Sequence, residues 1–125
     1  MSSPSVASPL VLAIVNARVR TADERRPWAD AVLVRGGLIE GVGSSAEIRK
    51  RAGATAHVID ARGMLVLAAA EGAPLARGSA ASLIIVERDA PDDVSTSISA
   101  GDIVLRLERG RVVVDRDSLV SPERP

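Results

Sequence analysis

The sequence predicts a single all-β domain, arranged as a β-sandwich with one short helix. Short apolar segments recur along the chain, and glycine-containing turn signals separate several of them. Strands and helices do not alternate, which argues against an α/β fold. The chain has 125 residues, of which 46% are hydrophobic, so one domain with a substantial core is expected.

The first predicted strand spans residues 11–19, an almost wholly apolar run. Residues 31–35 and 38–42 predict a hairpin, because Gly36 and Gly37 between them can supply the positive φ values of a tight primed turn. These three segments form the N-terminal part of the predicted sandwich.

One short helix is expected at residues 45–52. Ser44 and Glu47 match a capping box, in which the serine hydroxyl accepts from the third helical amide and the carboxylate reaches back. Gly53 stands where a C-cap glycine is common. Both ends of the helix are therefore marked in the sequence.

Further strands are expected on both sides of two Arg-Gly turns. Segments 57–60 and 64–67 flank the first turn, and segments 103–107 and 112–114 flank the second. Residues 83–86 are wholly apolar, as expected for a strand covered on both faces. The two-residue period places three apolar residues of segment 103–107 on one face: Ile103, Leu105 and Leu107.

The domain is expected to span residues 10–120, between flexible tails at 1–9 and 121–125, with a polar loop at 89–99. The apolar run at 10–15 has no basic segment before it and is too short to span a bilayer, which takes about 20 residues. The expectation is therefore a cytoplasmic protein without a signal peptide or membrane span.

Composition narrows the function further. Basic and acidic residues number 16 each, so no net charge favours nucleic acid or an anionic membrane. The chain contains no Cys, which excludes disulfides, thiolate nucleophiles and Cys-ligated zinc. Trp28 is the only Trp, Tyr or Phe, which argues against base stacking on single-stranded nucleic acid.

Two stretches of the chain carry a family resemblance. The first includes VLVRGGLI at 32–39 and VIDARGMLVL at 58–67; the second includes LARGSAASLIIV at 75–86 and GRVVV at 110–114. In this order they resemble the opening and closing segments of the amidohydrolase superfamily of metal-dependent hydrolases. The resemblance implies a composite β-sandwich, with residues 10–67 as its N-terminal part and residues 75–116 as its C-terminal part.

The resemblance also implies a catalytic barrel that this chain lacks. In the family, the first stretch continues into Pro-Gly and Asp-x-His-x-His, and the barrel carries the metal ligands. Here residues 68–74 read AAAEGAP and lead straight into the second stretch. A (β/α)₈ barrel takes about 250 residues, so these few cannot hold one. Ser82 is a second departure, because the family often has Asp at that position.

No residue is assigned a catalytic, cofactor-binding or metal-ligating role. His57 is the only histidine, and a histidine base normally needs a nucleophile and an orienting partner. Lys50 lies between two arginines, which favours a solvated helix face over a desolvated reactive amine. Two carboxylate pairs fall in predicted loops and are interpreted as turn residues: Asp23 with Glu24, and Asp92 with Asp93.

One motif gives an alternative function. Residues 41–46 read GVGSSA, which fits G-x-G-x-x-A between a strand and a helix, and Asp60 ends the next apolar segment. In a dinucleotide site such residues hold a pyrophosphate and a ribose. A nucleotide-binding module is therefore one further hypothesis, although the strand-turn-helix of the sandwich accounts for the same residues.

The leading hypothesis is a non-catalytic amidohydrolase-like sandwich, acting as a structural or interaction module without a cofactor. Loss of the barrel is expected to leave an apolar surface or a strand edge open, so self-association as a dimer is predicted. The alternative is a split or truncated hydrolase of carbon–nitrogen bonds, whose barrel is on a separate chain. Neither hypothesis includes nucleic acid or a membrane as a partner.

Overall fold

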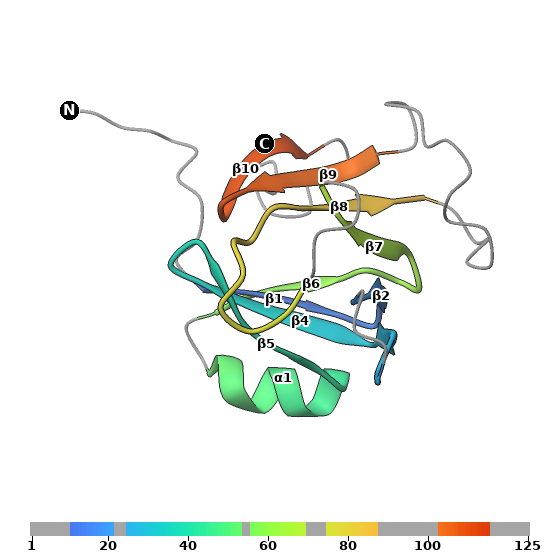
Figure 1. Ribbon diagram of the computed structural model, residues 1–125, viewed down its shortest axis with the longest axis vertical. Helices are drawn as coiled ribbons and strands as arrows, with labels where there is room; N and C mark the ends of the chain where they lie inside the picture. The colour runs from blue at the N-terminus through green and yellow to red at the C-terminus, as the bar shows by residue number, and fades with distance from the viewer. Residues whose placement is uncertain (1–10, 22–24, 54–55, 70–74, 88–102, 116–125) are drawn as a thin grey trace, which may run out of the picture.

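The computed structural model describes residues 11–21, 25–53, 56–69, 75–87 and 103–115. It confirms an all-β fold with one short helix: two mixed sheets pack face to face. Figure 1 shows three layers, with most of the six-stranded sheet uppermost, the four-stranded sheet in the middle and the helix below. The predicted loop at 89–99 and both predicted tails lie outside the described residues.

The four-stranded sheet is built wholly from the predicted N-terminal part, in the order β5-β4-β1-β6. Antiparallel pairing joins β1 to β4 and β4 to β5, whereas β1 and β6 are parallel. Its strands are β1 (Val11–Val15), β4 (Ala31–Arg35), β5 (Leu38–Gly43) and β6 (His57–Asp60).

The six-stranded sheet combines strands from both predicted parts, in the order β10-β9-β8-β7-β2-β3. The two parts meet where β7 pairs antiparallel with β8, and Ala68 lies opposite Leu83. The sandwich is therefore composite, as the resemblance implies. The strands are β2 (Arg18–Arg20), β3 (Trp28–Ala29), β7 (Leu65–Ala68), β8 (Leu83–Val86), β9 (Ile103–Glu108) and β10 (Arg111–Asp115).

The prediction of one continuous strand at 11–19 is wrong. The chain turns at Asn16, whose φ is 55°, and passes from β1 in one sheet to β2 in the other. Asparagine tolerates this left-handed conformation better than most residues. The same transfer occurs from β6 to β7, so the two parallel pairs, β1 with β6 and β2 with β7, cross between the sheets together.

The main core lies between the two sheets. Alternate residues of β1 and β4 face the six-stranded sheet, and their neighbours in sequence face α1 (Ser45–Ala52) on the other side. Every residue of β1 is therefore buried. The side chains that fill the space between the sheets include Leu12, Ile14, Val32, Ile85, Leu105 and Leu107.

The helix begins and ends where the sequence predicts. The Ser44 hydroxyl accepts from the Glu47 amide at 3.1 Å, and Gly53 caps the C-terminus at a φ of 82°. Ile48 and Ala52 are buried against the four-stranded sheet. Helix α1 thus covers the outer face of this sheet.

Two hairpin turns from different sheets touch each other. Gly36 and Gly37 turn β4 into β5, while Arg109 and Gly110 turn β9 into β10, and all four have positive φ. A Cβ atom built on Gly110 would lie 2.7 Å from Gly37 Cα. The Gly110 amide also donates to the Ala81 carbonyl at 2.9 Å. The contact between the two turns closes one end of the sandwich.

The expected alternation within 103–107 is interrupted. Leu105 and Leu107 face the main core, but Ile103 packs with a separate cluster on the outer face of the six-stranded sheet. The cause is a register shift in the β8–β9 pairing, where Val86 lies opposite Ile103 and Ile85 opposite Leu105. A bulge of this kind inserts one residue and reverses the alternation beyond it. By contrast, β8 is buried on both faces as predicted.

Candidate functional site

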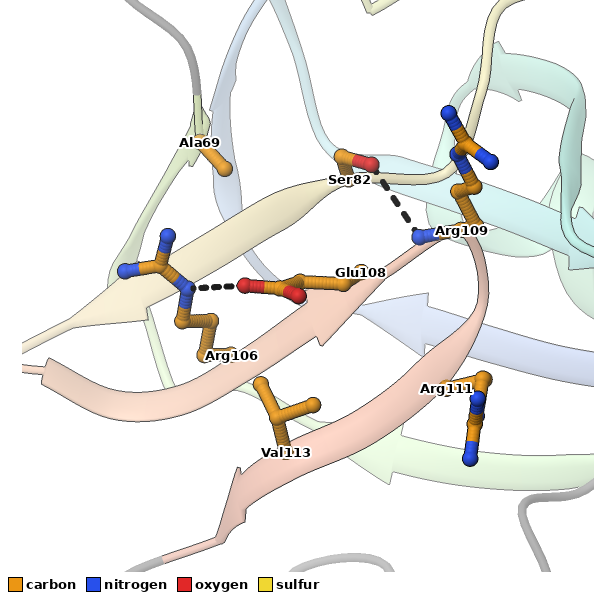
Figure 2. Close-up of a pocket in the computed structure, with 7 residues that line it drawn as sticks. All are labelled: Ala69, Ser82, Arg106, Glu108, Arg109, Arg111 and Val113. Atoms are coloured by element: carbon orange, nitrogen blue, oxygen red, sulfur yellow. Dashed lines mark hydrogen bonds and ion pairs between the residues drawn. The ribbon is translucent and has the colours of Figure 1, made fainter.

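A hollow among the described residues lies on the outer face of the six-stranded sheet, near the end of the β9–β10 hairpin (Figure 2). Its volume is about 670 Å³. Strand alternation explains the lining, because Arg106 lies between the core residues Leu105 and Leu107, and Glu108 follows Leu107. The hollow is lined by Ala69, Ser82, Arg106, Glu108, Arg109, Arg111 and Val113.

The polar contacts in this hollow are simple. Arg106 Nε donates to Glu108 Oε2 at 3.1 Å, and both side chains are exposed enough for water to weaken the ion pair. The Arg109 amide donates to the Ser82 hydroxyl at 3.0 Å. Figure 2 shows the Arg109 guanidinium on the other side of Ser82 from Arg106. The arginines favour anions, but they do not converge on one point.

The hollow contains no arrangement for acid–base or nucleophilic chemistry among its lining residues. Ser82 is beside arginines and has no histidine or carboxylate positioned as its base. Its hydroxyl instead tethers the β9–β10 turn, which gives a structural use to the position where the family often has Asp. Sequence reasoning missed this hollow, since Ala69 and Ser82 come together only through the β7–β8 pairing.

The GVGSSA motif does form a strand-turn-helix, but its glycines accommodate side chains of the helix. A Cβ atom on Gly43 would lie 2.6 Å from Glu47 Oε1, and one on Gly41 would lie 2.6 Å from the Arg51 guanidinium. The Glu47 carboxylate thus lies over the turn, where a pyrophosphate would need the helix N-terminus. A second negative charge there is unfavourable. These contacts argue against the nucleotide hypothesis.

Asp60 lies near the start of the same helix but serves the crossing between the sheets. Its carboxylate accepts from Arg62 N at 2.9 Å and from Asn16 Nδ2 at 3.2 Å. The backbone amide of Asn16 donates to the Ser45 hydroxyl at 2.9 Å. The hydrogen bond from Arg62 N, followed by that from Asn16, lowers the pKa of Asp60 below its usual value of 3.8. The carboxylate therefore stabilises the corner.

We expect Asp60→Asn to lower the free energy of unfolding at neutral pH but not in strong acid. Because the folded-state pKa is depressed, the carboxylate contributes stability above its unfolded pKa and loses it as pH falls through the folded value. Urea denaturation of both proteins from about pH 7 to about pH 2 measures the difference. A gap that stays constant to the lowest pH would contradict this assignment.

Of the other sequence candidates, the structure describes His57 and Lys50. His57 lies at the start of β6 and is partly buried, and Lys50 is exposed on α1. The two carboxylate pairs, Asp23 with Glu24 and Asp92 with Asp93, fall outside the described residues. Within the described ranges, no three His, Cys, Asp or Glu side chains come close enough to hold a metal ion.

Comparison with known proteins gives one curated relative. The chain is 48% identical over 56 residues to an N-substituted formamide deformylase from Arthrobacter pascens, which covers 45% of this chain and 10% of that protein. This similarity supports the amidohydrolase resemblance for part of the chain. The relationship was expected from the motifs at 32–39 and 58–67 and from those at 75–86 and 110–114.

Solved structures give partial matches to this chain. One is an uncharacterized metal-dependent hydrolase from Pyrococcus horikoshii OT3, with a TM-score of 0.40, 18% identity and coverage of 46% of this chain and 12% of the other. Another is enamidase, described as a member of the amidohydrolase superfamily, with a TM-score of 0.38, 36% identity and coverage of 45% and 15%. No family model matches the chain. The matched segment is about one tenth of the deformylase.

Proposed function

We propose that this chain is a non-catalytic, amidohydrolase-like sandwich that acts as a structural or interaction module. The observation that carries the proposal is the direct connection between the two parts of the sandwich. The backbone amide of Ala69 donates to the Ser82 carbonyl. The backbone amide of Leu75 donates to the Thr21 carbonyl. In the sequence only five residues separate Ala69 from Leu75, the point where the family inserts its barrel, and a barrel takes about 250 residues.

The inventory of ligating side chains supports the same proposal. A catalytic zinc site takes about three protein ligands and a water molecule. The whole chain offers one His and no Cys, and the described carboxylates do not cluster. A reaction centre built by this chain alone would therefore lack the donors that metal-dependent hydrolysis needs. In this sense the module is a pseudoenzyme.

The second candidate is the sandwich of a split hydrolase that acts on carbon–nitrogen bonds. Its support is the 48% identity to a deformylase over 56 residues. In that arrangement the metal and the substrate belong to a separate barrel-containing chain, and this chain supports it. If the module works without a barrel-containing chain, the interaction that we propose is self-association. For either form we propose a cytoplasmic location. Among the described residues no helix is long and apolar enough to cross a membrane.

The purified chain is expected to retain no stoichiometric zinc and to leave an N-substituted formamide uncleaved. Atomic emission after dialysis against excess zinc, followed by zinc-free buffer, measures the first property. Formate release measures the second. About one zinc per chain together with formate production would refute the proposal. Formate production only after a barrel-containing chain is added would favour the split enzyme.

A further inference from the structure

We draw no further inference here: the strongest candidate, the edge strand β10 of the six-stranded sheet with its half-exposed Val113 and Val114, carries nothing, because nothing among the described residues shows what covers it.

Discussion

Gly110→Ala is expected to lower the free energy of unfolding by about 3 kcal/mol or more, a large part of the stability of a small domain. The φ of Gly110 is 82°, which costs a residue with a Cβ atom about 1–2 kcal/mol. The added Cβ would also lie 2.7 Å from Gly37 Cα. That neighbour is backbone in a tight turn of the other sheet, so it cannot move away cheaply. Urea denaturation followed by Trp28 fluorescence measures the loss.

Gly63→Ala is the matched control for this experiment. Gly63 also follows an arginine in a two-residue turn and has a φ of 84°, but no atom lies within 4 Å of its Cβ position. It therefore isolates the conformational cost, and we expect a loss of about 1–2 kcal/mol. Equal losses for the two variants would show that the contact between the hairpin turns contributes nothing.

Leu105→Ala is expected to destabilise the protein by about 2–5 kcal/mol, the range for removing a large aliphatic side chain from a packed core. Leu105 is fully buried between the sheets, in the same cluster as Ile85 and Leu107. The substitution leaves a cavity where two rigid sheets face each other, and neither can collapse into it without losing strand pairing. The free energy of unfolding from urea titration measures the effect.

Leu38→Ala makes the same chemical change at a position that is 50% exposed. We expect it to cost about 0.5 kcal/mol or less, because water already covers half of the side chain. Comparable losses at both positions would mean that the space between the sheets is not the packed core described here. Equal slopes against urea concentration in the two titrations would confirm that both variants unfold from the same folded state.

Local signals made the helix and the tight turns predictable. Ser44, Glu47 and Gly53 determine both ends of α1 through contacts within a few residues. The turn at Gly36 and Gly37 follows from their tolerance of positive φ. The interior position of β8 follows from its unbroken apolar run. Each of these features is recorded in neighbouring residues, so a sequence is enough.

Features that depend on distant residues were not predictable. The break at Asn16 is stabilised by Ser45 and Asp60, and apolar residues resume after it at Ala17 and Val19. Strand β3 has two residues and exists through its pairing with β2. The reversed side of Ile103 arises from a bulge against β8.

The outer face of the six-stranded sheet, which carries the candidate site, was only partly predictable. The alternation of Arg106 and Glu108 with core residues was available from the sequence, since β9 is a clear strand. The approach of Trp28 to Arg18 and Arg20 was not, because it requires both the break at Asn16 and the pairing of β3. Arg18 and Arg20 therefore meet Trp28 only after the sheet is assembled.

The hydrogen bonds at Ala69 and Leu75 have an evolutionary consequence. Both residues are fastened to neighbouring strands of the sheet, on either side of residues 70–74. The entropy of closing a loop grows only with the logarithm of its length, so a short bridge and a long inserted domain between these two residues differ little in loop-closure cost. A single genetic excision could thus separate scaffold from enzyme and still leave a foldable gene product.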